Sequence, residues 1–241
     1  MARVAVVTGG TRGIGAAIST ALKAAGYTVA ASYAGNDAAA QKFKDETGIH
    51  VEKWDVGSVA ACREGIARVE AALGPVEVLV NNAGITRDGF FHKMTEEQWD
   101  EVIATNLKSC YGMCRAVIEG MRTRGFGRIV NLSSVNGQKG QLGQVNYAAA
   151  KAGMIGFTKA LALEGASKGI TVNCIAPGYV LTEMTGAIAQ PVLDKIIAQI
   201  PIGRMGLPAE IARTVLYLVA DEAAFITGAT ISINGGQYMV G

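Results

Sequence analysis

Strand-like and helix-like segments alternate along the whole chain, and this alternation restricts the fold more than any other feature of the sequence. The run RVAVVTGG at residues 3–10 is rich in β-branched residues and ends in a glycine turn. Residues 14–26 follow with apolar side chains at helical spacing. Further strand-like runs, separated by helical patterns, lie at residues 27–33, 49–56, 76–84, 127–135, 170–178 and 229–236. Such alternation is typical of a parallel sheet covered by helices.

These patterns predict a single α/β domain over residues 1–241, with a doubly wound Rossmann fold of about seven parallel strands and helices on both faces. The 31 glycines are spread along the chain, so no linker-like segment divides it. Ligands of such sheets bind beyond the carboxyl ends of the strands. We therefore expect the functional residues at the strand-to-helix junctions.

Charge and composition argue against several other classes of protein. A formal net charge of +2 without a stripe of Lys and Arg does not favour a nucleic-acid partner. The uncharged stretch at 223–241 is interrupted by Thr, Asn, Gln and four glycines, which argues against a membrane helix. The N-terminus lacks the length and the cleavage site of a signal peptide. The cysteines and histidines show no metal-ligand spacing, so we expect no metal. Cys110 and Cys114 stand at helical spacing and are expected to be small, buried thiols in a reducing cytosol. We expect a soluble, cytoplasmic protein.

The first strand-to-helix junction, TGGTRGIG at residues 8–15, is the candidate phosphate-binding turn. Glycines let the backbone approach a pyrophosphate, and the helix that follows supplies free amides and the positive end of its dipole. The spacing departs from G-x-G-x-x-G because Ile18 stands in place of the third glycine, and a purely structural turn is the alternative. A P-loop is disfavoured because no Gly-Lys-Ser/Thr follows. The expected cofactor contacts here are Gly9, Thr11, Arg12, Gly13, Ile14 and Gly15.

The end of the second predicted strand indicates NADP as the cofactor. An NAD site usually has Asp or Glu there on the ribose 2′-hydroxyl, whereas this chain has Ser32 and Tyr33. Asp37 follows as a typical helix N-cap, and Arg12 can face a 2′-phosphate. A solvated turn residue is the alternative for Arg12, and the missing carboxylate disfavours it. The adenine and its ribose are expected at two further junctions, each of which could also be a simple turn: Asp55 and Val56, and Asn82, Ala83 and Gly84.

The motif NYAAAKAG at residues 146–153 places Tyr147 and Lys151 four residues apart, on one face of a predicted helix. An ordinary alanine-rich helix is the alternative. The preceding strand ends near Ser134, so the three polar side chains can converge at one junction. A tyrosine in water has a pKa of about 10, and a neighbouring cation stabilises the phenolate. Because no histidine occupies a suitable junction, we expect Tyr147 to be the general acid, with the alanines leaving room for the cofactor.

The glycine turn, NNAG, the serine, Tyr-x-x-x-Lys and the PG junction occur in an order that resembles the short-chain dehydrogenase/reductase family over essentially the whole chain. The resemblance implies that Tyr147 donates the proton and that Ser134 hydrogen-bonds the substrate carbonyl. It implies that Lys151 holds the nicotinamide ribose and stabilises the phenolate, and that Asn106 positions a water in a proton relay to Lys151. With NADPH/NADP+ as the cofactor, it adds contacts from Pro177, Gly178, Val180 and Thr182.

Within the family, the chain is similar to reductases of 3-oxoacyl thioesters through NNAGITRD and GFTKALALEGASKGITVNCIAPGYV. It is especially similar to bacterial enzymes that reduce acetoacetyl-CoA for polyhydroxybutyrate synthesis, through HKMTEEQWDEVIATNLKS, RGFGRIVNLSSVNGQKGQLGQVNYAAAKAG and IPIGRMGLPAEIA. This similarity implies (R)-3-hydroxybutyryl-CoA as the product. Glutamines in the loop at 136–144 can hydrogen-bond a short polar acyl chain better than a long hydrocarbon one. The expected substrate contacts are Asp88, Ser134, Gln141, Gln144, Tyr147, Gly178 and Tyr179.

Two other functions stay open from the sequence. Reductases of carrier-protein-linked 3-oxoacyl chains in fatty-acid synthesis share every catalytic residue, and Arg122, Arg124 and Lys168 could form a basic patch for an acidic carrier. Such residues near helix ends are more often solvated or paired with the helix dipole. A non-catalytic NADP sensor or scaffold is the second alternative, and the intact catalytic set argues against it. Family members are commonly homotetramers, and the helices around 95–124 and 147–168 could supply the interface.

Overall fold

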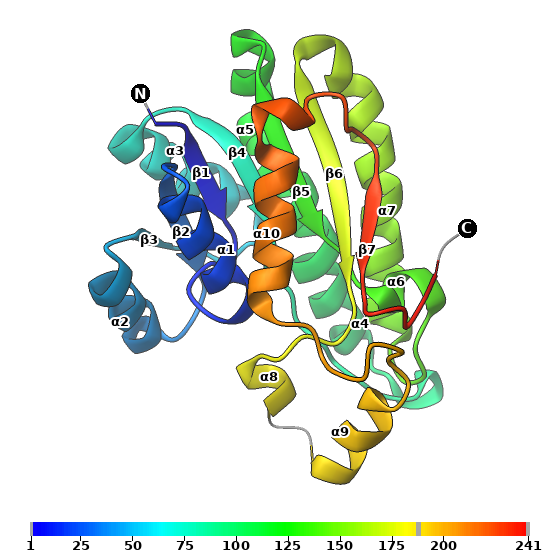
Figure 1. Cartoon of the computed structure of the whole chain (residues 1–241). Helices are drawn as coiled ribbons and strands as arrows, with labels where there is room; N and C mark the ends of the chain where they lie inside the picture. Colours follow the sequence, from blue (N-terminus) through cyan, green and yellow to red (C-terminus); the bar gives the residue numbers. More distant parts are fainter. Residues whose placement is uncertain (1, 187–188, 240–241) are drawn as a thin grey trace.

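The computed structural model describes residues 2–186 and 189–239, which form one seven-stranded parallel sheet with helices on both faces (Figure 1). The strands are β1 (Val4–Val7), β2 (Thr28–Tyr33), β3 (His50–Lys53), β4 (Val76–Asn81), β5 (Gly127–Leu132), β6 (Ile170–Pro177) and β7 (Thr230–Ile233). Their order is β3-β2-β1-β4-β5-β6-β7, and every neighbouring pair is parallel. The order reverses direction between β1 and β4, which is the doubly wound topology. The predicted fold class is confirmed.

Helices cover both faces of the sheet. They are α1 (Gly13–Ala24), α2 (Asp37–Thr47), α3 (Val59–Leu73), α4 (Glu96–Ile103), α5 (Ser109–Arg124), α6 (Val135–Lys139), α7 (Val145–Gly165), α8 (Glu183–Gly186), α9 (Gln190–Ile197) and α10 (Pro208–Val219), with short turns η1 (Phe91–Lys93), η3 (Ala166–Lys168) and η4 (Asp221–Ala223). In Figure 1, α1 and α10 lie side by side over one face, while α3, α5 and α7 belong to the other.

The strands β1, β2, β4, β5 and β6 are mostly buried because they carry apolar side chains on both faces, whereas the edge strands β3 and β7 are only partly buried. Val7 packs with Ile18 in the core on the α1 and α10 side. Its neighbour Val6 packs with Ile66 in the core on the α3 and α5 side. Successive residues of a strand point to opposite faces, so a strand buried on both faces is a continuous apolar run. This explains why the sequence shows β-branched runs without polar alternation.

Two segments differ from the expected elements. The residues predicted as one helix at 95–125 contain a π-helical turn, η2 (Ala104–Lys108), which buries Asn106 between α4 and α5. The expected loop after Ser134 begins with the one-turn helix α6, which Ser134 caps by accepting from the backbone N–H of Asn136 at 3.1 Å. α6 packs closely on α7, since a Cβ on Gly137 would lie 2.7 Å from the Cβ of Lys151. Both elements, η2 and α6, lie near the carboxyl edge of the sheet.

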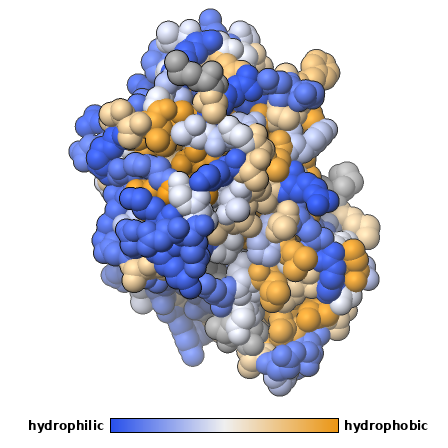
Figure 2. Space-filling view, turned by 60° about the vertical axis from the view of Figure 1, so that its left-hand side comes forward, coloured by the Kyte–Doolittle hydropathy of each residue, from blue (hydrophilic) through white to orange (hydrophobic). Residues whose placement is uncertain are grey.

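The segment that carries α8 and α9 extends from the carboxyl edge of the sheet, at the bottom of Figure 1. Exposed apolar side chains on and beside these helices include Leu181, Val192 and Ile202. Figure 2 shows apolar residues gathered over this part of the surface, at the lower right of the view. An apolar surface therefore lies at the edge where ligands of such sheets bind.

No helix within residues 2–186 and 189–239 has the length and apolar character needed to cross a membrane.

All four cysteines are free and buried, which the sequence predicted for Cys110 and Cys114. Burial raises the pKa of Cys62 to about 11 and that of Cys110 to about 12. The thiolate is the reactive form of cysteine, so these thiols are chemically inert at neutral pH.

Candidate active site

A cavity of about 850 Å³ lies along the carboxyl ends of the strands, where the sequence places the chemistry. The predicted cofactor residues that line it are Gly9, Thr11, Arg12, Gly13, Ile14, Gly15, Ser32, Tyr33, Asp55, Val56, Asn82, Ala83, Gly84, Tyr147, Lys151, Pro177 and Thr182. Two others are not among its lining residues: Val180 is buried in the core, and Gly178 lies against Asn234. Their cofactor contacts stay predictions.

Several lining residues are absent from the sequence-based set. They are Ala34, Gly35, Asn36, Ala39, Trp54, Ile85, Thr86, Thr105, Leu132, Ser133 and Glu183. The residues from Ala34 to Ala39 could have been found from the start of α2, whose N-cap is Asn36 and not Asp37. Asn36 accepts from the backbone N–H of Ala39 at 3.0 Å and has a left-handed backbone (φ 56°), which asparagine tolerates well. Asp37 instead pairs with Lys53 at 2.8 Å.

Hydrogen bonds fasten the glycine turn after β1 to the loop after β4. The Thr8 hydroxyl accepts from the backbone N–H groups of Asn82 and Ala83, each at 3.0 Å. Asn82 Nδ2 donates to the carbonyl oxygens of Thr8 (2.9 Å) and Gly9 (3.2 Å). A Cβ on Gly15 would lie 2.1 Å from the Gly9 oxygen of the same turn and 2.6 Å from Asn82 Nδ2 of the loop after β4, so only glycine fits at this position. The side-chain amide of Asn82 thus binds the glycine turn.

These features fit a dinucleotide. Thr182 faces the turn from the opposite side, with its Cγ2 3.6 Å from the position of a Cβ on Gly13. Ser32 is 1% exposed and lines the cavity, and its hydroxyl has no hydrogen-bond partner among the described residues. A buried, unpaired hydroxyl beside a cavity indicates a polar ligand. Amides at the start of α1, together with that hydroxyl, can hold phosphate and ribose groups.

Ser134, Tyr147 and Lys151 lie on adjoining ends of β5 and α7. The buried Lys151 donates from Nζ to the Leu132 oxygen at 2.6 Å, and its Nζ is 5.6 Å from the centre of the Tyr147 ring. The Ser133 hydroxyl donates to the carbonyl oxygen of Lys151 at 2.8 Å, which fixes α7 against β5. A lysine has three donors, so Lys151 keeps two for a ligand. Ser134 accepts at its cap and keeps its own hydroxyl hydrogen for donation.

Asn106 reaches the same place from the π-helical turn. Its Nδ2 donates to the oxygen of Ile85 at 2.9 Å, and its Oδ1 accepts from the N–H of Ile85 at 2.8 Å. A Cβ on Gly84 would lie 3.2 Å from Asn106 Oδ1 and 3.5 Å from Lys151 Nζ. The two polar side chains therefore converge at Gly84, which lines the cavity.

The alanines between Tyr147 and Lys151 are not among the lining residues of the cavity, and Ala149 is exposed while Ala150 is buried. On the helix, Ala149 points away from the face that Tyr147 and Lys151 share, while Ala148 and Ala150 flank that face. The room that these alanines would leave for the cofactor stays a prediction.

The loop after β4 and the segment between α6 and α7 are joined through Gln144. Its Nε2 donates to both carboxylate oxygens of Asp88, at 3.1 and 2.9 Å, and its Oε1 accepts from Asn136 Nδ2 at 3.0 Å. The backbone N–H of Gly89 adds a bond to the oxygen of Gly143 at 2.8 Å. The structure thus brings the predicted substrate residues Asp88 and Gln144 together, and their contacts with a substrate stay predictions.

The remaining predicted substrate residues differ in their surroundings. Tyr179 is half-buried, and burial, with the Asp88 carboxylate and the Tyr147 oxygen nearby, raises the pKa of Tyr179. Its hydroxyl therefore stays protonated at neutral pH and can donate. Gln141 accepts from Lys139 Nζ at 3.1 Å through its side-chain oxygen, which leaves its amide N–H groups for other partners.

Within the described residues, no group of three or more His, Cys, Asp or Glu side chains is placed to hold a metal ion.

The chain matches known proteins along almost its whole length. Residues 9–237 match the family described as Enoyl-(Acyl carrier protein) reductase. The chain is 69% identical over 241 residues to the acetoacetyl-CoA reductase of Shinella zoogloeoides, covering 100% of both chains. It is 67% identical over 239 residues to the acetoacetyl-CoA reductase of Rhizobium meliloti (strain 1021), covering 99% of both. The 3-oxoacyl-[acyl-carrier-protein] reductase of Escherichia coli (strain K12) is 45% identical over 240 residues, covering 99% of this chain and 98% of that protein.

Proposed function

The chain belongs to the short-chain dehydrogenase/reductase family, and we propose that it reduces acetoacetyl-CoA to (R)-3-hydroxybutyryl-CoA with NADPH, as a supply for polyhydroxybutyrate synthesis. The observation that carries this proposal is the placement of Tyr147 and Lys151 in the wall of a cavity that fits a dinucleotide. The substrate is supported by the higher identity to two acetoacetyl-CoA reductases than to a carrier-protein-linked reductase. The configuration of the product and the pathway rest on the family resemblance.

NADPH is the proposed cofactor because of the side chains around the end of β2. Ser32 and Tyr33 line the cavity there, and neither carries a charge that would repel a 2′-phosphate. Arg12 also lines the cavity from the glycine turn and is exposed, so its guanidinium is free to approach that phosphate. The nearby carboxylate of Asp37 is paired with Lys53, which reduces its repulsion of a phosphate.

The reaction follows from what each side chain can donate. When bound, NADPH supplies the hydride that reduces the 3-oxo carbon. Tyr147 donates its hydroxyl proton to the carbonyl oxygen, and Ser134 donates a hydrogen bond to the same oxygen. Lys151 stabilises the phenolate left behind, and its remaining donors hold the ribose hydroxyls. Asn106 holds the water through which the proton returns.

The carrier-protein-linked reaction is the second candidate, and the structure weakens its main support. Arg122, Arg124 and Lys168 lie just before the first residues of β5 and β6. They therefore lie at the amino edge of the sheet, whereas the cavity lies at the carboxyl edge. A carrier docked on this basic patch would stand at the wrong end of the strands to deliver a thioester.

The direct test is to follow NADPH consumption with acetoacetyl-CoA, with the carrier-protein thioester and with longer 3-oxoacyl chains. We expect kcat/KM for acetoacetyl-CoA to exceed the others by about tenfold or more, the size of one well-matched pocket contact. NADH should be roughly 10- to 100-fold poorer, because it lacks a charged hydrogen-bond partner for Arg12. Equal kcat/KM values for long carrier-linked chains would refute the acetoacetyl-CoA assignment.

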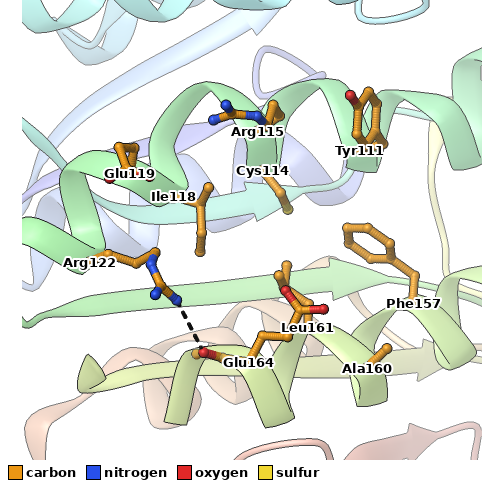
Figure 3. Close-up of a pocket in the computed structure, with 11 residues that line it drawn as sticks. Tyr111, Cys114, Arg115, Ile118, Glu119, Arg122, Phe157, Ala160, Leu161 and Glu164 are labelled. Atoms are coloured by element: carbon orange, nitrogen blue, oxygen red, sulfur yellow. Dashed lines mark hydrogen bonds between the residues drawn. The ribbon is translucent and has the colours of Figure 1, made fainter. Parts of the chain in front are cut away.

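A homotetramer in the cytoplasm is part of the proposal. Four buried, free cysteines suit a reducing compartment. A groove of about 550 Å³ runs between α5 and α7, and Figure 3 shows apolar and charged side chains facing it. It is lined by Tyr111, Cys114, Arg115, Ile118, Glu119, Arg122, Phe157, Ala160, Leu161, Glu164 and Gly165. Small exposed residues at helical spacing, Ala149, Ala152, Gly156 and Ala160, leave room for a second copy of α7 to approach.

An Ala160→Arg variant tests this interface. The new side chain would occupy the groove and add a charge to the face that meets the second copy, while leaving the core untouched because Ala160 is exposed. We expect the molar mass measured by light scattering after size-exclusion chromatography to fall below that of the parent. Ala67→Arg, on the exposed face of α3, is the matched control and should keep the parent mass. An unchanged mass for Ala160→Arg would rule out this face.

A further inference from the structure

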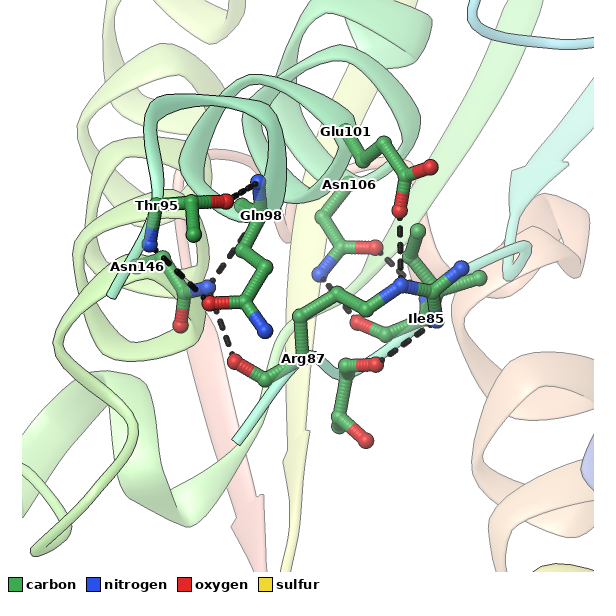
Figure 4. Close-up of polar contacts among 8 residues, drawn as sticks. Ile85, Arg87, Thr95, Gln98, Glu101, Asn106 and Asn146 are labelled. Atoms are coloured by element: carbon green, nitrogen blue, oxygen red, sulfur yellow. Dashed lines mark hydrogen bonds and ion pairs between the residues drawn. The ribbon is translucent and has the colours of Figure 1, made fainter. Parts of the chain in front are cut away.

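Asn146, directly before Tyr147, is fully buried, and its amide joins three segments of the chain (Figure 4). Its Nδ2 donates to the carbonyl oxygens of Arg87 and Gln98, each at 3.1 Å. Its Oδ1 accepts from the backbone N–H of Tyr147 at 2.7 Å. One side chain therefore ties the first turn of α7 to the loop after β4 and to α4.

The two carbonyl groups that Asn146 holds are themselves fixed. Arg87 Nε pairs with Glu101 Oε2 on α4 at 2.6 Å. Gln98 belongs to a capping box with Thr95, in which each residue's side chain accepts from the other's backbone N–H. Asn146 thus binds two residues that have further contacts with α4 or its N-cap, and the start of α7 is tied to them.

The same loop is held at its other end by Asn106. Within the loop after β4, the N–H and the oxygen of Ile85 are both bound by the Asn106 side chain. Two buried asparagines therefore hold one short loop between them, one beside the proposed proton relay and the other beside the proposed general acid. The loop sets the distance between these two parts of the site.

We propose that Asn146 is a positioning residue for the proton transfer, because it fixes the backbone of Tyr147 against the loop at residues 85–87. The proposal rests on the proposed role of Tyr147. Asn146 is not among the residues that line the cavity, so it acts through Tyr147. Only an amide side chain supplies two donors and an acceptor at this reach: aspartate lacks the donors, and serine has one.

The test compares Asn146→Ala with Asn173→Ala. Asn173 is also fully buried, and its amide is equally engaged, donating to the Ile226 oxygen at 2.7 Å and accepting from the Ala229 N–H at 3.1 Å. Its partners lie in the segment before β7, away from the cavity. Both variants leave buried carbonyl and N–H groups unpaired, so both should lower the melting temperature. Only Asn146→Ala should affect the reaction specifically.

For Asn146→Ala we expect kcat with acetoacetyl-CoA to fall about 10- to 100-fold, since a displacement on the order of 1 Å costs up to about 100-fold. The Kd for NADPH, measured by its fluorescence, should change less than about threefold, because the glycine turn is untouched. Asn173→Ala should keep kcat within about twofold of the parent. Equal kcat losses in the two variants would reduce Asn146 to a structural residue and overturn the proposal.

Amide hydrogen exchange gives a second readout that needs no activity. We expect Asn146→Ala to speed exchange in the first turn of α7 and at residues 85–89, and Asn173→Ala to leave both at the parent rate. Unchanged exchange in Asn146→Ala overturns the positioning role even if the substrate assignment is wrong. A parent chain that does not reduce acetoacetyl-CoA refutes the proposed function alone. Should Asn146→Ala fail to fold, Asn146→Ser keeps one donor and should show the same changes at smaller size.

Discussion

A Tyr147→Phe variant should bind NADPH as tightly as the parent and reduce acetoacetyl-CoA about 10²- to 10⁴-fold more slowly, which corresponds to about 3–5 kcal/mol of transition-state stabilisation. The change removes one hydroxyl and keeps the ring that lines the cavity beside Lys151. Packing and cofactor contacts should therefore survive, while the proton donor is lost. Steady-state kinetics with a separate fluorescence titration of NADPH separates the two effects.

The control for this change is Tyr217→Phe, which removes a hydroxyl from an exposed tyrosine on α10 and should leave kcat unchanged. A Tyr147→Phe enzyme with parental turnover would show that the proton comes from elsewhere. A variant that loses NADPH affinity in step with turnover would instead place the Tyr147 hydroxyl in cofactor binding. The two outcomes are told apart by the ratio of the changes in kcat and Kd.

The fold could be predicted because its signals are repeated and local. Most strands are short apolar runs that end at a turn, and the longer helices between them show their own period, so the successive strand-and-helix units support one another. The π-helical turn at Ala104–Lys108 gives no such signal, because one inserted residue barely disturbs a helical pattern. The helix α6 also gives no signal in the sequence, since a single turn is too short to show a helical period. It is held by the Ser134 cap and by contact with α7.

The sequence could assign the candidate catalytic residues to one edge of the sheet, but it could not predict their hydrogen-bond partners. Strand ends and motif spacing place Tyr147, Lys151 and Ser134 at one edge, because the topology brings those ends together. Spacing says nothing about which amide binds which carbonyl. Asn82 is engaged by the glycine turn and Gln144 by Asp88, through bonds between residues far apart in the chain. Such choices follow from the relative orientation of loops, which only three-dimensional packing fixes.

A Gly15→Ala variant should lose NADPH affinity by about 100-fold or more and unfold at lower temperature, at a cost of roughly 1–3 kcal/mol from overpacking. The added Cβ would lie 2.1 Å from the Gly9 oxygen and 2.6 Å from Asn82 Nδ2, well inside contact distance. The Gly9 oxygen belongs to the glycine turn, and Asn82 Nδ2 binds that turn from the loop after β4. The added Cβ must therefore distort the turn and push the loop away from it. Isothermal titration with NADPH and thermal unfolding measure the two effects.

The sign of the stability change makes Gly15→Ala decisive. Gly15 is the third residue of α1, and replacing a helical glycine by alanine ordinarily stabilises a protein by up to about 1 kcal/mol. Destabilisation therefore reports the steric closure of the two loops, whereas stabilisation with intact NADPH binding would show that the turn has room and that the cradle is built differently. Thr20→Ala, at an exposed position of the same helix, supplies the ordinary helix response for comparison. Because Gly15 lies where the two loops meet, NADPH affinity and thermal stability should both fall in Gly15→Ala. Neither should fall in Thr20→Ala.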